Sequence, residues 1–150
     1  MPTTPETSPR PSPPTKEDWE RLAEAARLAR SHAHAPYSKF SVGAALLAAN
    51  GEVFAGCNVE NLSFGLTLCA ERNAIAAAVA AGAVRPDLSP RGMVVLADTR
   101  LPISPCGACR QVMAEFGDFP LMMQTLEGKR EQTSVSQLLP RASTGILDRD

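Results

Sequence analysis

Two short stretches decide how this chain is organised: Cys69-Ala70-Glu71 and, further along, Pro105-Cys106-Gly107-Ala108-Cys109. They supply three thiols and one carboxylate. A tetrahedral zinc ion with three protein ligands keeps one corner for water, and it lowers the pKa of that water so that hydroxide is available near neutral pH. A carboxylate beside the metal, but not bound to it, can then transfer protons. The inventory therefore indicates a zinc site that activates water.

Four longer segments contain these stretches or precede them. They are Pro36-Tyr37-Ser38-Lys39-Phe40, Gly56-Cys57-Asn58-Val59-Glu60-Asn61, Cys69-Ala70-Glu71-Arg72 and Ser104-Pro105-Cys106-Gly107-Ala108-Cys109-Arg110-Gln111. The cysteines and the carboxylate resemble the signature of zinc deaminases in its three-cysteine form. Together, the segments closely resemble the small, tetrameric cytidine deaminases of pyrimidine salvage, over roughly residues 17 to 140. Four motifs in order are far more specific than one C-x-x-C.

The resemblance implies a role for each residue of the two stretches. Cys69, Cys106 and Cys109 would bind one Zn²⁺ per subunit, and Glu71 would be the catalytic acid and base. Glu71 would move one proton from the zinc-activated water to N3 of cytosine and a second to the departing amino group. The implied reaction is hydrolytic deamination of cytidine and 2'-deoxycytidine to uridine and 2'-deoxyuridine, with release of ammonia.

The resemblance also implies the substrate-binding residues. Phe40 would pack on the pyrimidine ring, and the Ala70 amide would bind the base carbonyl. Asn58 and Glu60 alternate along an extended segment and therefore project to the same side. They would hold the ribose hydroxyls, with Glu60 on the 3'-OH. The alternatives are a core residue at a strand start for Phe40, a turn cap for Asn58 and simple solvent exposure for Glu60.

Two arginines follow site residues directly, Arg72 after Glu71 and Arg110 after Cys109. Three thiolates on one divalent cation leave a net negative cluster, so hydrogen bonds from nearby cations to the sulfurs are expected. Arg72 is assigned this supporting role because the family uses this arginine against a thiolate. For Arg110, a bond to sulfur and a solvated helix arginine both remain open.

The remaining cysteine, Cys57, and the two histidines are not assigned to the metal site. As a fourth ligand, Cys57 would close the site and leave a purely structural zinc. Its distance from Cys69 is not a usual ligand spacing, so we interpret it as a buried core thiol. His32 and His34 are interpreted as helix-end residues.

The composition limits the class of protein. The 150 residues are 44% hydrophobic and 21% charged, values that suit one globular domain, and the formal net charge of -1 lacks the basic excess of a general nucleic-acid binder. No apolar run reaches the length of a membrane span or resembles a signal peptide. Four cysteines in a chain without an export signal are typical of free thiols and not of disulfides, so we expect a cytoplasmic protein. We also expect a small nucleoside substrate and neither a nucleic-acid nor a membrane partner. The resemblance adds a homotetramer.

Local patterns predict the domain organisation. Residues 1–15 form a proline-rich, disordered tail, residues 16–140 the deaminase domain and residues 141–150 a C-terminal tail. Thr15 and Asp18 form a capping box for a helix that runs to about His34. The other expected elements are strands at 40–48 and 52–57 joined by an Asn50-Gly51 turn, helices at 69–81, 107–116 and 135–139, strands at 92–97 and 120–126, and a polar return strand after 127–128.

This alternation predicts an α/β fold with a sheet between helices. The resemblance sharpens it to the three-layer α/β/α cytidine deaminase-like fold with a mixed central sheet.

The sequence departs from the family at two positions and leaves two other functions open. Ser143 stands where an aromatic residue commonly follows Leu138-Leu139-Pro140, and Phe64 stands where tyrosine is frequent. One alternative is deamination of a modified cytosine nucleoside such as blasticidin S. The other is a zinc-stabilised interaction domain, in which Cys57 binds the metal and Glu71 is dispensable.

Overall fold

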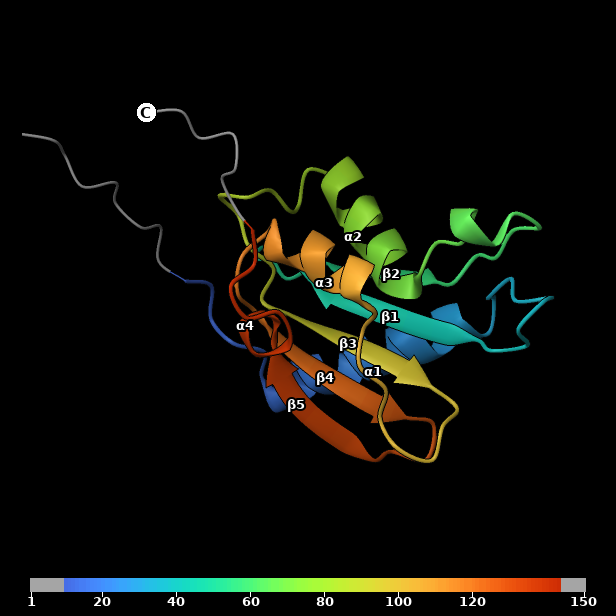
Figure 1. Cartoon of the computed structure of the whole chain (residues 1–150). Helices are drawn as coiled ribbons and strands as arrows, with labels where there is room; N and C mark the ends of the chain where they lie inside the picture. Colours follow the sequence, from blue (N-terminus) through green and yellow to red (C-terminus); the bar gives the residue numbers. More distant parts are fainter. Residues whose placement is uncertain (1–9, 144–150) are drawn as a thin grey trace, which may run out of the picture.

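A mixed five-stranded sheet organises residues 10–143, the part of the chain described by the computed structural model (Figure 1). The elements are α1 (Lys16–Arg30), β1 (Val42–Leu47), β2 (Val53–Cys57), the 3₁₀ turn η1 (Phe64–Leu66), α2 (Ala70–Ala80), β3 (Gly92–Ala97), α3 (Gly107–Ala114), β4 (Pro120–Thr125), β5 (Arg130–Ser134) and α4 (Val135–Leu138). The strand order is β2-β1-β3-β4-β5. Among the described strands only β3 and β4 pair in parallel, so the predicted mixed sheet is confirmed.

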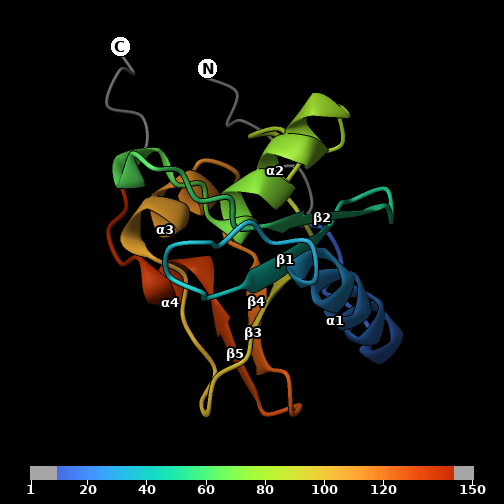
Figure 2. The ribbon, with the colours of Figure 1, turned by 90° about the vertical axis from the view of Figure 1, so that its right-hand side faces the viewer.

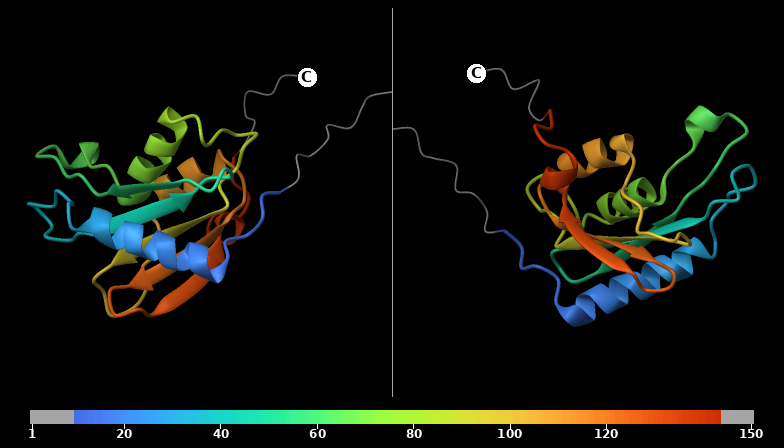
Figure 3. Two further views of the ribbon diagram at one scale, coloured as in Figure 1. Left: turned by 180° about the vertical axis from the view of Figure 1, so that it is seen from behind. Right: turned by 60° about the horizontal axis from the view of Figure 1, so that its bottom comes forward.

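Helices cover both faces of the sheet. Helix α1 lies on one face, and α2 and α3 lie on the other (Figures 2 and 3). Successive side chains of β1 serve different layers, since Leu46 joins the core with α2 and α3 and Leu47 the core with α1. This alternation is the two-residue period of a strand. The predicted three-layer architecture is therefore confirmed.

Two glycines allow the helices to approach the strands closely. A Cβ atom at Gly43 would collide with the carbonyl of Ala26 in α1. A Cβ atom at Gly56 would lie 2.6 Å from the amide nitrogen of Ala74 and 2.7 Å from the carbonyl oxygen of Ala70, both in α2. Only glycine fits such contacts. The Gly56 contact holds the first turn of α2 directly above the end of β2.

Helix α1 begins as predicted and ends earlier. The Asp18 amide donates to the Thr15 hydroxyl at 3.1 Å, and the Thr15 amide donates to the Asp18 carboxylate at 2.9 Å, which is the predicted capping box. The helix stops at Arg30, so its predicted extension to about His34 is wrong. The His34 amide instead donates to Asn58, and the His34 carbonyl accepts from Glu60. Backbone pairing with a distant segment thus replaces the last helical turn.

The segment before α1 contacts the folded domain. Arg91 donates to the carbonyl of Ser12 at 2.9 Å and of Pro13 at 3.4 Å, and it forms an ion pair with Asp18 at 2.8 Å. Residues 1–9 and 144–150 lie outside the described part, so disorder of the two tails and the domain limits stay predictions. No helix within residues 10–143 combines the length and the apolar character needed to cross a membrane.

The buried Asp18 carboxylate generates a stability prediction. The hydrogen bond from the Thr15 amide is the main cause that lowers the Asp18 pKa; burial opposes it, and Arg91 assists. Asp18→Ala should lower the free energy of unfolding at neutral pH by about 1–2 kcal/mol, since it removes a helix cap. Urea denaturation measures this loss, and Glu17→Ala, in the same turn but exposed, is the control with a smaller effect.

The sign of the pH dependence follows from the lowered pKa. Asp18 stabilises the fold above its unfolded pKa of about 3.9, and this stabilisation is lost as the pH falls through the lower folded pKa. The difference between the wild type and Asp18→Ala should therefore shrink in acid. A difference independent of pH between 3 and 7 would contradict this role for the charge.

Candidate active site

Two helix N-termini bring three thiols together at one end of the sheet. Cys69 is the N-cap of α2, Cys106 is the N-cap of α3, and Cys109 lies in the first turn of α3. The Sγ atoms are 3.7 Å apart for Cys69 and Cys106 and 3.4 Å apart for Cys106 and Cys109, and all three lie within 4.8 Å of one another. A tetrahedral zinc ion about 2.3 Å from each sulfur needs separations of about 3.8 Å. The donor set and its spacing fit Zn²⁺.

The other cysteine stays outside this cluster. Cys57 is the last residue of β2. Within residues 10–143, the cluster of sulfur atoms consists of Cys69, Cys106 and Cys109 and does not include Cys57. Cys57 is half-buried and belongs to neither core cluster of the described residues, so its predicted burial in the core is wrong. Three thiols leave one corner of a tetrahedron for water, which a closed structural site lacks.

The environment of Cys69 favours its thiolate. Hydrogen bonds, first from the Cys109 thiol and then from Arg72 and Cys106, lower the pKa of Cys69 to about 5 against the opposing effect of burial. The same hydrogen bond raises the pKa of Cys109, which keeps its proton in the metal-free protein. A position at a helix N-terminus adds to this preference for negative charge. Cys69 is thus a ready ligand at neutral pH.

The two arginines beside the cysteines make different contacts. Arg72 donates through Nη2 to the Cys69 sulfur and to the Thr67 carbonyl, each at 3.4 Å. Its bond to Cys69 is the main cause that raises the pKa of the guanidinium. Arg110 reaches no sulfur among the described residues and donates to oxygen atoms of the protein instead.

Glu71 faces the cysteines from the first turn of α2. It is only 5% exposed, and burial is the main cause that raises its pKa. The Cys109 sulfur lies 3.8 Å from its Oε2 atom. A carboxyl group whose pKa is raised toward neutrality can both accept and donate a proton. Its place beside the sulfurs suits a proton-transfer role.

A cavity of about 300 Å³ opens next to the cysteines, with mostly apolar walls. Seven of the residues named from the sequence line it: Phe40, Asn58, Glu60, Cys69, Ala70, Glu71 and Cys106. Sequence reasoning did not single out five others: Ser38, Val42, Thr67, Ile103 and Ser104. Ser38 and Ser104 lie within the quoted motifs, whereas no sequence signal marks Ile103. The fold thus assembles one chamber from segments distant in sequence.

The predicted base- and ribose-binding residues shape the wall of this chamber. The Asn58 side chain donates to the Phe40 carbonyl at 2.8 Å and accepts from the Val42 amide at 2.9 Å, so it fastens the start of β1 to the end of β2. Phe40 is 40% exposed and is not a core residue. Glu60 accepts the amides of Tyr37 and Ser38 at 2.9 and 3.1 Å. A hydrogen bond from Ser38 is the main cause that lowers the Glu60 pKa, so the carboxylate is charged at neutral pH.

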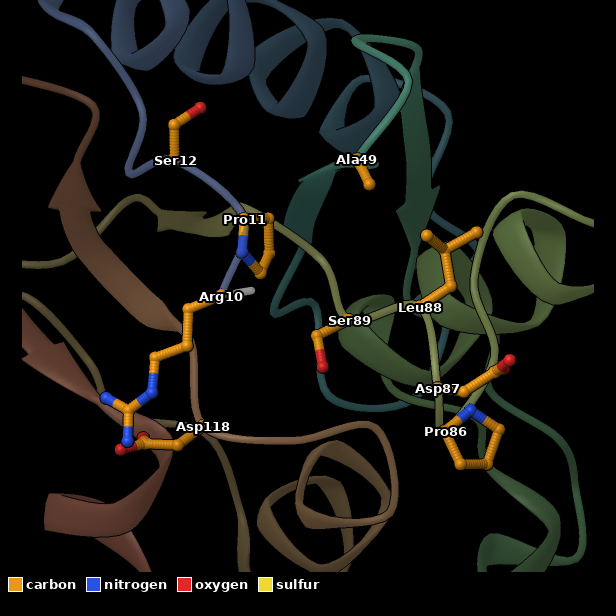
Figure 4. Close-up of a pocket in the computed structure, with 9 residues that line it drawn as sticks. All are labelled: Arg10, Pro11, Ser12, Ala49, Pro86, Asp87, Leu88, Ser89 and Asp118. Carbon is orange, nitrogen blue, oxygen red and sulfur yellow. The ribbon is translucent and has the colours of Figure 1, made fainter. Parts of the chain in front are cut away.

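A second, larger cavity lies at the opposite end of the strands. It has a volume of about 620 Å³ and is bounded by the segments before α1, before β3 and before β4 (Figure 4). Its two carboxylates already have partners, since Asp87 pairs with Arg85 at 3.0 Å and Asp118 accepts from Ser136 at 2.8 and 2.9 Å. It has no cysteine in its lining, so the chamber beside Cys69 is the candidate active site.

Comparisons with known proteins agree with this geometry. The family model described as "Cytidine and deoxycytidylate deaminase zinc-binding region" matches residues 16–124. A cytidine deaminase of Sporosarcina psychrophila is 50% identical over 127 residues, which cover 83% of this chain and 90% of the relative. One of Halalkalibacterium halodurans is 47% identical over 129 residues, covering 85% and 95%. A crystal structure of the cytidine deaminase from Burkholderia pseudomallei has a TM-score of 0.77 at 48% identity and covers 83% of this chain and 98% of that one.

Arg72 generates the prediction for this site. Arg72→Gln should raise the pKa of Cys69 in the metal-free protein from about 5, because the cationic donor to the sulfur is lost. It should also weaken zinc binding by about 10-fold or more. Thiolate absorbance against pH and competition with a chelator measure the two effects. Arg85→Gln, on an exposed loop, is the control, and an unchanged titration together with unchanged zinc affinity in Arg72→Gln would exclude the role.

Proposed function

The chain belongs to the cytidine and deoxycytidylate deaminase family, and on that premise we propose that it hydrolyses cytidine to uridine and ammonia. One observation carries the proposal. A single chamber holds a buried carboxylate, Glu71, against two of the three clustered cysteines, with an aromatic ring, Phe40, on another wall. We include 2'-deoxycytidine as a substrate.

Cys69, Cys106 and Cys109 are the proposed zinc ligands. When bound, Zn²⁺ supplies a Lewis acid that lowers the pKa of a water molecule. The support is the approach of all three sulfur atoms to within 4.8 Å and the low pKa of Cys69. Arg72 offsets part of the negative charge through its bond to the Cys69 sulfur.

Glu71 is the proposed carrier of both protons. It takes one proton from the attacking water and delivers it to N3 of the pyrimidine while the water oxygen bonds to C4. The second proton then goes through Glu71 to the exocyclic nitrogen, the C4–N bond breaks, and ammonia leaves. The near-complete burial of Glu71 supports this role, since a raised pKa brings the carboxyl group closer to the working pH.

The remaining residues are proposed to orient the nucleoside. The Ala70 amide, in the first turn of α2, has no hydrogen-bond partner within residues 10–143 and binds the base carbonyl, and the Phe40 ring packs on the base. One N–H of the Asn58 amide is used on Phe40, which leaves the second N–H for a ribose hydroxyl. Glu60, fixed by two backbone amides, accepts from the 3'-OH. In this proposal, one end of the chamber binds the base and the other end binds the sugar.

We also propose a homotetramer in the cytoplasm that acts in pyrimidine salvage. Apolar side chains on the segment that carries η1 are exposed beside the chamber, including Leu62 at 81% and Phe64 at 70%. Clusters of this kind commonly mark protein interfaces. Free thiols at all four cysteines, which lie within the described residues, support a reducing compartment. The number of four subunits comes from the family resemblance.

The first prediction of this proposal is ammonia release from cytidine. The zinc-loaded protein should release ammonia and form uridine in equal amounts, and a chelator that removes zinc should stop the reaction until zinc is added back. Glu71→Ala should keep its zinc and lose turnover by about 10²–10⁴-fold or more, because a general acid and base is removed.

Two results would contradict the proposal. One is a zinc-loaded wild type that leaves cytidine unchanged, and the other is a Glu71→Ala variant with normal turnover. Blasticidin S, tested beside cytidine, addresses the modified-nucleoside alternative, and a higher kcat/KM on blasticidin S would change the assigned substrate.

A second prediction tests the sugar end of the chamber. The wild type should process cytidine with a higher kcat/KM than 3'-deoxycytidine, because Glu60 loses its hydrogen-bonding partner in the deoxy compound. Glu60→Gln should lower kcat/KM for cytidine, because a charged acceptor binds a hydroxyl more strongly than an amide does. The ratio of kcat/KM for cytidine to kcat/KM for 3'-deoxycytidine should therefore be smaller in Glu60→Gln than in the wild type. Steady-state kinetics of both proteins on both substrates measures the coupling between the side chain at position 60 and the 3'-OH. An undiminished preference in Glu60→Gln would contradict contact with the 3'-OH.

A further inference from the structure

The guanidinium group of Arg110 donates hydrogen bonds to three oxygen atoms, and none of them belongs to a proposed zinc ligand. Its Nε atom donates to the Pro105 carbonyl at 2.7 Å, Nη2 to the Ser104 hydroxyl at 3.0 Å, and Nη1 to the Leu138 carbonyl at 2.9 Å. The side chain is half-buried, and Pro105 is buried. Buried carbonyl groups in proteins are almost always hydrogen-bonded, and the Nε atom of Arg110 supplies the donor for Pro105.

The first two bonds reach the segment that connects β3 to α3. This segment supplies Ile103 and Ser104 to the wall of the chamber and leads directly into Cys106. It has no regular secondary structure from residue 102 to residue 106, and prolines at 102 and 105 lack amide donors. Among the described residues, the hydrogen bonds that hold Ser104 and Pro105 come from Arg110. The segment therefore depends on a side chain for its position.

The third bond ties this segment to the end of the described chain. Leu138 is the last residue of α4, and the side chain of the next residue in α3, Gln111, donates to the Ser143 carbonyl at 3.2 Å. Helices α3 and α4 lie against each other (Figure 1). Arg110 thus joins the first turn of α3, the segment before it and the C-terminal helix.

We propose that Arg110 is a positioning residue that sets both the Cys106 corner of the metal site and the Ser104 wall of the substrate chamber. The second half of this statement rests on the function proposed above. The geometry requires arginine, because a planar fork with donors on three nitrogens spans three separate acceptors, whereas a lysine ammonium is a compact point charge. Arg110 acts through Cys106 and Ser104, so it differs from Arg72, which donates to a sulfur directly.

The competing explanation is that Arg110 only stabilises the fold. Arg91 provides the matched control, since it also binds backbone carbonyls, those of Ser12 and Pro13, and lies at the opposite end of β3. Arg91→Ala should lower the Tm and leave the metal site intact. Arg110→Ala should change the metal site beyond what its own loss of Tm explains.

Zinc release is the main readout. Each zinc-loaded protein is mixed with an excess of a chromophoric chelator without substrate, and the rate of zinc transfer is recorded. Arg110→Ala should release zinc about 10–100-fold faster than the wild type, the usual effect of losing an outer contact of a metal site. Arg110→Lys should stay close to Arg110→Ala, and Arg91→Ala should match the wild type. In the cobalt-substituted proteins, only the Arg110 variants should shift the thiolate-to-cobalt absorption.

The chamber wall has its own readout. Ser104→Ala removes one of the three acceptors and should raise KM for cytidine with a smaller change in kcat, whereas zinc release should change less than in Arg110→Ala. Ser104→Ala and Arg110→Lys keep the test decisive where Arg110→Ala fails to fold.

Three outcomes would overturn the proposal: wild-type zinc release in the Arg110 variants, an equal acceleration in Arg91→Ala at the same loss of Tm, or full rescue by lysine. Because zinc release needs no substrate, a wild type that fails to deaminate cytidine contradicts the proposed function and not the role of Arg110 at the metal.

Discussion

The meeting of two helix N-termini over one end of the sheet is the constraint on which the site depends. Cys69 and Cys106 each occupy the N-cap position of a helix, where the amides of the first turn and the helix dipole favour negative charge. Helix α2 reaches this point because Gly56 lets its first turn rest on β2. Any bulkier residue at Gly56 would push α2 outward and carry Cys69 and Glu71 away from α3. The packing of α2 on Gly56 thus contributes to the position of Cys69 beside α3.

The position of each arginine on its helix explains why Arg72 and Arg110 make different contacts. Arg72 follows Cys69 by three positions in the same helix, which places its guanidinium on the side of that sulfur. Arg110 follows Cys109 directly and turns back over the segment before α3, where carbonyl and hydroxyl oxygens accept its protons. One arginine donates to a sulfur of the cysteine cluster, and the other donates to the backbone segment that leads into Cys106. Similar positions in two motifs therefore have different physical roles.

The chamber joins structure and binding in the same side chains. Asn58 was open to two interpretations, a cap or a substrate contact. Its amide joins Phe40 and Val42, and its second N–H has no acceptor among the described residues. Phe40, whose carbonyl accepts from the Asn58 side chain, lines the chamber and is 40% exposed. A polar residue that is 8% exposed can serve the wall and the ligand together when its donors exceed the internal acceptors.

The sequence by itself determined the local features: the Thr15 and Asp18 capping box, the Asn50-Gly51 turn, the apolar strands and the placement of Cys69 two positions before Glu71. Each depends on residues a few positions apart, so the local sequence is enough to predict it. Only the tertiary structure decided where α1 ends, because His34 pairs with Asn58 and Glu60 across the fold. It also decided that Cys57 is only half-buried at the end of β2 and that Arg110 binds Leu138, 28 positions away. Such contacts depend on the packing of helices on the sheet, and no local pattern of residues encodes the distance between two side chains that packing brings together.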